Sequence, residues 1–392
     1  MVIIPLNVPL NFLTDYITAT ASILKVNNQV MFLNYQDPIS IFSLVTKKKD
    51  RFKFWLSVKK LYAPIKFGSF EFKLIGIFPF QRIHFFKRVN IYLGFLQLKL
   101  IFTFLKNKQI LCWGFHPVLL YLIQVLKINL SVYDCLDYYG SEIENGAELY
   151  KMEKKLLNEV TLASFCSKTL LNIKKCEHPG IDTKAIAISM GCNFSLFNKA
   201  RVYQFGSLLG KKRIGIFGHF NFRLDYKLLR ELISLHPNWS FVFGGPIYIE
   251  KNEDLTENVH KNVTILKSYK NVFFLGKISK NKLVQYINSI TVCLIPYRTD
   301  FPAAKYCNPM KAYEYLACGK PIVSTPLPAL RELNLECIQF ASTSDDFSKK
   351  IKYFLNHWSV ADRLNAKKIA YKHRWEKRVL ILQKELFKRT GA

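Results

Sequence analysis

The sequence of 392 residues lacks the features that mark several large protein classes. Its nine cysteines are odd in number and form no Cys-x-x-Cys pair, which argues against a disulfide scaffold and indicates reduced, buried thiols of a cytosolic protein. The most apolar window, residues 91–105, is interrupted by Gln97 and Lys99 and is too short to span a bilayer, so it is interpreted as a core helix. The N-terminus lacks the basic region and cleavage site of a signal peptide.

Acidic residues are scarce, with 28 Asp and Glu against 57 Lys and Arg, which gives a net charge of +29. Residues 1–111 hold 16 basic and 4 acidic side chains (net +12), and residues 345–392 hold 13 and 5 (net +8). Such an excess favours an anionic partner. Nucleic-acid-binding motifs are absent, whereas basic and aromatic residues interleave in 47–55 and 85–88, which favours an anionic membrane surface. A solvated basic face is the alternative.

Internal repeats and low-complexity tracts are also absent, and 50% apolar with 22% charged residues describes an ordered globular chain. Its length suits two domains. Short apolar runs alternate with helical stretches, which predicts doubly wound parallel sheets. We expect strands at 30–33, 74–78, 110–113, 130–134, 162–166 and 185–188, then, after a linker near 192–212, at 213–218, 240–244, 272–276 and 290–295.

The stretch 289–325 predicts a strand, a loop, a helix and a second strand. We expect Asn308 to cap the helix, Pro309 to occupy its first turn, and Gly319 to end it in the left-handed conformation. A helix N-terminus at the carboxyl end of a parallel strand binds anions. One turn further, Glu314 is placed to accept hydrogen bonds from ribose hydroxyls. The alternative is a surface helix in which Lys311 and Glu314 form an ion pair.

Helical periodicity predicts two faces for this helix. The face toward the sheet is expected to carry Met310, Tyr313, Leu316 and Ala317. The other face is expected to carry Lys311, Glu314, Tyr315 and Cys318.

The sixteen residues from Asn308 to Val323 resemble the nucleotide-sugar signature of GT-B glycosyltransferases. They are most similar to the family-four-like bacterial enzymes of surface polysaccharide synthesis, in which the residue matching Glu314 holds the donor ribose. The stretches 214–225, 237–246 and 132–137 resemble further parts of these enzymes, and the similarity fades over the first 110 residues.

The resemblance implies an α/β GT-B architecture of two Rossmann-like, doubly wound domains that face a cleft. We expect an acceptor-side domain over 1–200, a donor domain over 201–360, and a C-terminal helix over 361–392, centred on 361–387, that returns to the first domain. Two features depart from the family. Tyr306 stands where many members have a first Glu, and the N-terminal Gly-rich loop is missing, since the first glycine is Gly68.

Sugar transfer from a nucleoside diphosphate requires neutralisation of the leaving diphosphate. Since no Asp-x-Asp motif occurs, we expect no metal and no cofactor, and assign this role to cations. The candidates are Lys311, Lys305 and Arg223, each of which is otherwise a solvated cation. Donor binding is also expected to involve Gly218, Asn308, Pro309 and Met310.

On the acceptor side, a carboxylate after a strand of the first domain is placed to orient or deprotonate a hydroxyl. Asp134 and Asp137 are the candidates, with turn capping as the alternative role. His116, which precedes Pro117, is expected to face the cleft, although a lone histidine is more often structural.

The predicted function is transfer of a hexose from a UDP- or GDP-sugar to a lipid-linked glycan in capsule, lipopolysaccharide or teichuronic-type polymer synthesis. The resemblance implies retention of anomeric configuration. The expected place is cytoplasmic, peripheral on the inner face of the cell membrane. Alternatives are a nucleotide-sugar epimerase of the same architecture and a catalytically silent membrane-bound partner.

Overall fold

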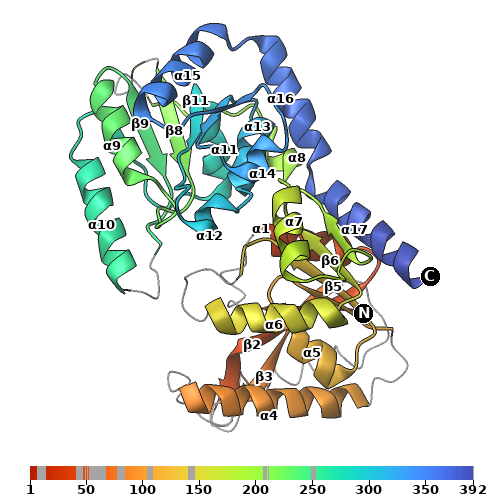
Figure 1. Ribbon diagram of the computed structural model, residues 1–392. Coiled ribbons are helices and arrows are strands. Elements are labelled where there is room, and N and C mark those ends of the chain that lie inside the picture. The colour runs from red at the N-terminus through yellow and green to blue at the C-terminus, as the bar shows by residue number, and fades with distance from the viewer. Residues whose placement is uncertain are drawn as a thin grey trace.

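The structure, a computed structural model, contains two parallel β-sheets that lie one above the other in Figure 1. It describes residues 1–6, 15–40, 47–48, 50, 52, 68–76, 84–103, 109–139, 146–205, 210, 212–248 and 253–391. Much of the basic, aromatic stretch 47–55, the ends of the predicted strand 74–78 and window 91–105, and part of the linker 192–212 lie outside these residues.

The first sheet has seven parallel strands in the order β3-β2-β1-β4-β5-β6-β7. Its strands are β1 (Val2–Leu6), β2 (Gln29–Ser40), β3 (Gly68–Gly76), β4 (Leu111–Gly114), β5 (Leu130–Cys135), β6 (Leu162–Phe165) and β7 (Ala185–Ala187). The helices between them are α1 (Asp15–Leu24), α4 (His84–Thr103), α5 (Leu119–Leu126), α6 (Gly146–Glu159) and α7 (Lys168–Glu177). This order changes direction between β1 and β4, as in a doubly wound sheet.

Strand β1 lies at the centre of this sheet, yet sequence patterning did not predict it. Its apolar run contains Pro5, which lacks an N–H and is a poor residue for a central strand. The pairing explains why Pro5 is tolerated. β1 pairs with β4 only at Val2 and Ile3, so Pro5 lies beyond that ladder and pairs with β2 alone, opposite Leu33.

The second sheet has six parallel strands in the order β10-β9-β8-β11-β12-β13. They are β8 (Arg213–Phe217), β9 (Ser240–Gly244), β10 (Val272–Phe274), β11 (Val292–Ile295), β12 (Ile322–Ser324) and β13 (Ile338–Phe340). The helices are α9 (Tyr226–Leu235), α10 (Glu253–Lys267), α11 (Lys280–Asn288), α12 (Pro302–Lys305), α13 (Met310–Ala317), α14 (Pro328–Arg331) and α15 (Ser344–His357). The predicted α/β class with two doubly wound parallel sheets is confirmed.

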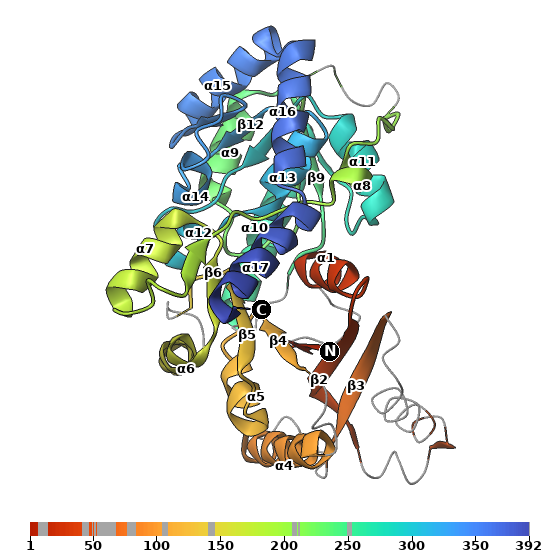
Figure 2. The same ribbon diagram turned by 90° about the vertical axis from the view of Figure 1, so that its right-hand side faces the viewer.

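The C-terminal segment forms two helices where a single helix was predicted over 361–387. Helix α16 (Val360–Lys372) packs on α13, and α17 (Trp375–Thr390) packs on α1 and β6 (Figure 2). The break between them pairs with the linker, because the Cys192 N–H donates to the His373 carbonyl at 3.1 Å and the Trp375 N–H donates to the Cys192 carbonyl at 3.3 Å. A side chain at Gly191 would lie 2.9 Å from the His373 carbonyl oxygen, so the linker approaches here as bare backbone.

The nine cysteines are free thiols, and eight of them are buried while Cys176 is exposed. Burial raises the pKa of Cys307 to about 11 and that of Cys318 to about 12, which keeps both thiols protonated. The prediction that most of the cysteines are buried is confirmed. In the described part of the chain, no helix combines the length and the apolar character needed to cross a membrane.

Candidate functional site

Two glycine turns lie at the carboxyl ends of β8 and β9. Gly218 and Gly245 have φ angles of +118° and +147°, which favour glycine. A Cβ on Gly245 would lie 1.9 Å from the Gly218 carbonyl oxygen, so the two turns pack backbone against backbone. The two glycines therefore add no side chains to this edge of the sheet.

Lys311 lies directly over this edge. Its Nζ is 3.0 Å from the position that a Cβ on Gly218 would take, and 5.0 Å from the centre of the Tyr297 ring. The structure thus brings together Gly218 and Lys311, which are 93 residues apart in the sequence (311 − 218) and were both predicted as site residues.

Glu314 occupies the next turn of α13 and is 7% exposed. Burial raises the pKa of its carboxyl to about 7, against the opposing effect of Lys311 and Lys280. No hydrogen bond from the described residues reaches this carboxylate. A largely buried carboxylate that keeps some contact with solvent and receives no hydrogen bond from the described residues is a candidate ligand-binding group, because donors supplied by a ligand would offset its desolvation.

His219 follows Gly218 and was not predicted. Partial removal of its ring from water, together with the charge of Lys311, lowers its pKa, so the ring is neutral at neutral pH. Its position immediately after a glycine that ends a strand was the signal available in the sequence. A neutral imidazole beside Lys311 adds a hydrogen-bonding group to this edge without adding charge.

Arg223 and Asp137 meet across the two domains. Arg223 Nη2 lies 3.0 Å from Asp137 Oδ1, and the side chains are 25% and 45% exposed. Arg223 follows β8 in the second domain, and Asp137 follows β5 in the first. Two residues that were predicted to line the cleft are therefore in contact, and the Arg223 charge points toward the first domain.

Asp134 is fully buried, and its hydrogen bonds indicate a structural role. Its two oxygens accept hydrogen bonds from Arg378 of α17, both at 2.6 Å, and Ser164 donates a further hydrogen bond at 2.5 Å. This arrangement leaves no room to accept a proton from an acceptor. Of the two aspartates considered in the sequence, Asp137 alone is partly exposed at the domain boundary.

His116 lies in the loop after β4, beside the segment that carries Asp137. The Val118 N–H approaches His116 Nδ1 at 3.3 Å, and the His116 ring meets Tyr139 edge-on at 5.3 Å. The Tyr139 hydroxyl donates to the Phe115 carbonyl at 3.1 Å. Both loops are thus tied together at one edge of the first sheet.

The start of α13 differs from the prediction. Helix α13 begins at Met310, with Pro309 in the N-cap position and no side-chain cap. Asn308 does not cap it: its amide donates to the Cys166 carbonyl of the first domain at 2.7 Å and accepts from the Tyr313 hydroxyl at 3.1 Å. The N–H groups of the first turn of α13 are therefore left without a side-chain acceptor.

The predicted faces of α13 were also partly wrong. Tyr315 was expected to point away from the sheet, but its hydroxyl donates to the Phe217 carbonyl of β8 at 3.3 Å and accepts from the Phe217 N–H at 2.9 Å. Residues 312–317 are all buried, because the sheet covers one side of α13 and α16 covers another.

Lys305 and Tyr306 end the short helix α12. Lys305 Nζ lies 5.4 Å from the centre of the Tyr306 ring, and that ring lies 5.6 Å from the ring of Tyr138 in the first domain. The tyrosine found in place of the expected carboxylate is thus part of an aromatic contact between the domains.

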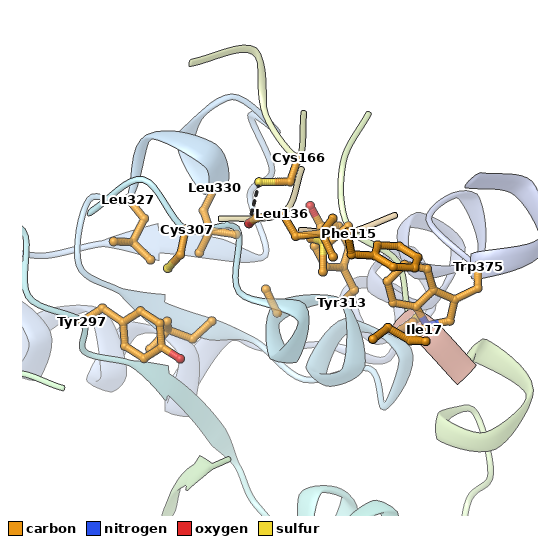
Figure 3. Packing of buried hydrophobic residues seen from close by; sticks show 14 of the residues in the cluster. Ile17, Phe115, Leu136, Cys166, Tyr297, Cys307, Tyr313, Leu327, Leu330 and Trp375 are labelled. Atoms are coloured by element: carbon orange, nitrogen blue, oxygen red, sulfur yellow. Dashed lines mark hydrogen bonds between the residues drawn. The ribbon is translucent and has the colours of Figure 1, made fainter. Parts of the chain in front are cut away.

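Apolar side chains also join the domains behind these polar groups. Figure 3 shows Phe115, Leu136 and Cys166 of the first domain close to side chains of the second. The second domain supplies Tyr297, Cys307, Tyr313, Leu327 and Leu330. The described residues contain no group of three His, Cys, Asp or Glu side chains that could hold a metal ion. Metal independence stays a prediction.

Residues 225–383 match a protein-family model described as glycosyl transferase-like. A putative teichuronic acid biosynthesis glycosyltransferase of Bacillus subtilis, TuaH, is 24% identical over 239 residues, which is 56% of each chain, so the match spans little more than half of that relative. An uncharacterized glycosyltransferase of Methanocaldococcus jannaschii is 21% identical over 66% of this chain and 70% of its own length.

Solved structures match the whole chain. The Anabaena protein HepE, solved in complex with UDP-glucose, superposes with a TM-score of 0.68 at 14% identity, covering 100% of this chain and 99% of that one. Sucrose-phosphate synthase from Thermosynechococcus elongatus gives a TM-score of 0.69 at 14% identity, with 100% and 98% covered. The likeness to GT-B glycosyltransferases is thereby confirmed, and the narrower family-four-like assignment stays a prediction. The chain has the GT-B fold, and its residues 225–383 match the glycosyl transferase-like family.

Proposed function

We propose that this protein is a glycosyltransferase that takes a sugar from a nucleoside diphosphate sugar. The buried Glu314 carboxylate, beside Lys311 and the bare backbone of Gly218, carries this proposal. A ribose offers two hydroxyl donors, and a diphosphate offers negative charge to the lysine and to the uncapped start of α13. The glycosyltransferases among the relatives and the UDP-glucose complex of HepE support the same assignment.

On the donor side, each residue has a distinct role. Glu314 accepts hydrogen bonds from the ribose, and Lys311 faces the diphosphate. Asn308, Pro309 and Met310 position the first turn of α13. Lys305, at the end of α12, adds a second cation. Lys311 acts most strongly as the transition state forms, because negative charge then develops on the departing diphosphate.

Transfer breaks the bond between the anomeric carbon of the sugar and the diphosphate oxygen, and an acceptor hydroxyl forms the new bond to that carbon. The acceptor proton moves to a base of the first domain, for which Asp137 and His116 are the candidates. The Arg223–Asp137 contact of 3.0 Å orients the carboxylate. The diphosphate leaves with its charge balanced by Lys311, Lys305 and the α13 N-terminus, without a metal.

The donor is a UDP- or GDP-sugar and the transferred group a hexose. The reaction is retaining, so the acceptor oxygen approaches the anomeric carbon from the face that the diphosphate leaves. The acceptor is a lipid-linked glycan in cell-surface polysaccharide synthesis of the capsule, lipopolysaccharide or teichuronic type, and the protein works at the cytoplasmic face of the membrane. The relative whose name refers to teichuronic acid and the basic composition support this assignment.

A catalytically silent role is a second candidate, because Tyr306 replaces a carboxylate with an aromatic ring that packs on Tyr138. Incubation with a donor separates the two functions. An enzyme slowly hydrolyses or transfers the sugar, and this should continue in excess chelator. A silent protein binds the nucleotide and leaves the sugar intact.

Thermal unfolding with UDP, GDP and their sugars tests donor binding. A ligand at 100 times its dissociation constant stabilises the native state by about 2.7 kcal/mol, which raises the melting temperature measurably. We expect one nucleoside diphosphate to stabilise the protein and its sugar conjugate to do the same. Absence of any shift with every nucleotide would contradict the proposal.

A further inference from the structure

The outward sides of α16 and α17 are unusually apolar for a protein surface. Of the sixteen exposed large apolar side chains among the described residues, six lie in these two helices. They are Val360, Leu364, Tyr371, Leu380, Ile381 and Phe387, with exposed fractions of 69%, 56%, 50%, 51%, 38% and 49%. Scattered single residues of this kind need no explanation, but a cluster on adjoining helices indicates an interaction surface.

The exposed apolar residues of α17 form one stripe along the helix. Leu380, Ile381 and Phe387 alternate with Lys377 and Lys384 at spacings of three and four residues, which places all of them on one side of the helix. The residues that pack on the first domain occupy the opposite side. They are Trp375, Arg378, Val379, Leu382 and Leu386.

Helix α16 also carries exposed apolar side chains. Val360, Leu364, Lys368 and Tyr371 follow one another at the same spacings and are all exposed, while Ala366 and Ala370 are buried. Figure 2 shows α16 and α17 running end to end in front of the two sheets. We call the exposed side chains of the two stripes the strap face; α16 packs on the second domain and α17 on the first.

The charge of residues 360–391 indicates which kind of partner the strap face would bind. Among residues 360–391 the exposed charged side chains are six basic and one acidic, and five of the six basic ones are lysine. Interfaces between proteins are depleted in lysine, which argues against a protein partner. A nucleic acid would pair with the lysines through its phosphates but leave the apolar stripe uncovered. An anionic lipid surface satisfies both, since lysines reach the headgroups while apolar side chains enter the acyl boundary.

We propose that the strap face docks the protein on an anionic lipid bilayer. This docking surface differs from the basic stretch 47–55 that the sequence favoured. The helices that carry it contact both domains. Docking through α16 and α17 is independent of donor binding, because neither stripe contributes to the Glu314 site.

Vesicle flotation with phosphatidylcholine alone, and with phosphatidylglycerol added to about one third, tests the charge requirement. The strap variant carries Lys368→Gln, Lys377→Gln and Lys384→Gln. The matched control carries Lys227→Gln, Lys261→Gln and Lys270→Gln, which removes three exposed lysines on or near α9 and α10, at the left of Figure 1, away from the strap. We expect the strap variant to bind anionic vesicles about 100-fold more weakly, roughly fivefold for each lysine, and the control to bind as the native protein does.

A second pair of variants tests the apolar contribution. Leu380→Ser with Phe387→Ser should weaken binding about tenfold. Leu235→Ser with Ile265→Ser, which changes two other exposed side chains (49% and 37%), should not. Circular dichroism and thermal unfolding verify that each variant is folded, and the shift given by nucleoside diphosphates reports the donor site separately.

Three results would overturn the proposal: no binding of the native protein to anionic vesicles, equal binding to neutral ones, or equal loss in the strap and control variants. These results would remove the proposed place at the membrane but not the proposed donor site, whose occupation the nucleotide shift reports. Preferential binding to RNA without vesicle binding would likewise overturn it in favour of a nucleic acid.

Discussion

Each domain buries a carboxylate near the domain boundary, but the two carboxylates differ in the hydrogen bonds that they receive. In the first domain, Asp134 is 0% exposed and receives hydrogen bonds from Arg378 and Ser164. In the second domain, Glu314 is 7% exposed and receives none from the described residues. Burial raises the pKa of Glu314 to about 7.

This difference distinguishes a carboxylate that stabilises the fold from one that has no partner in the described part of the fold. A buried charge is costly unless it is paired and hydrogen-bonded. Where the chain supplies the partners, as Arg378 does, the carboxylate joins elements of the fold. Where it supplies none, as at Glu314, we propose that a ligand supplies them. The number of hydrogen-bond donors around a buried carboxylate is therefore more informative than its burial.

The largest effect on stability is expected from breaking the ion pair between Arg378 and Asp134. Arg378→Met leaves Asp134 as an uncompensated buried charge and should lower the free energy of unfolding by about 3–5 kcal/mol, measured by urea denaturation. The double variant with Asp134→Asn should recover part of this loss, because the uncompensated charge is gone. A loss of under about 1 kcal/mol in the single variant would mean that the pair does not hold α17 in place.

Glu314→Ala should affect the ligand instead of the fold. We expect nucleoside diphosphate affinity to fall about 30-fold, the equivalent of about 2 kcal/mol for hydrogen bonds to a charged group, with the melting temperature of the free protein unchanged or higher. Titration calorimetry measures the affinity. Glu376→Ala, which removes an exposed glutamate on α17, is the control. Unchanged affinity in the Glu314 variant would contradict its assignment to the ribose.

Lowering the pH should weaken nucleotide binding through Glu314. The carboxylate is ionised above its raised pKa of about 7 and protonated below it, so its acceptor strength falls between pH 8 and pH 5.5. The loss should approach tenfold per pH unit at most. Glu314→Gln provides the reference, because titration of the nucleotide itself affects both proteins equally. Parallel pH profiles for the two proteins would show that Glu314 does not titrate in this range.

The smallest change in stability is expected at the Arg223–Asp137 contact. Both side chains are partly exposed, so Asp137→Asn should alter the free energy of unfolding by less than about 1 kcal/mol. Turnover should fall by about 100-fold or more with KM for the donor nearly constant, because the acceptor-side base is lost. Steady-state kinetics decide this, and a variant with native turnover would leave His116 as the base.

Patterning and motif similarity predicted the two sheets and the strand–loop–helix–strand unit around Glu314, because each depends on residues close in sequence. The errors at Asn308, Asp134 and Tyr315 share one cause. Asn308 bonds to a carbonyl 142 residues away, and the partner of Arg378 is 244 residues away. Tyr315 turns toward the sheet because α16, from the end of the chain, covers another side of α13. A periodicity argument cannot include neighbours that arrive through the fold.

The pairing of Cys192 with the break between α16 and α17 has a mechanical consequence. The chain passes between the domains twice, once through the linker and once through the C-terminal helices, and the two passages are hydrogen-bonded to each other at residues 192 and 373–375. Two crossings at one place act as a single pivot, whereas crossings at two separate places would lock the domains. When a domain rotates about such a pivot, each residue moves in proportion to its distance from the pivot. The more remote contacts of the boundary, such as Tyr138 with Tyr306, would therefore separate first while the backbone bridge stays nearly still.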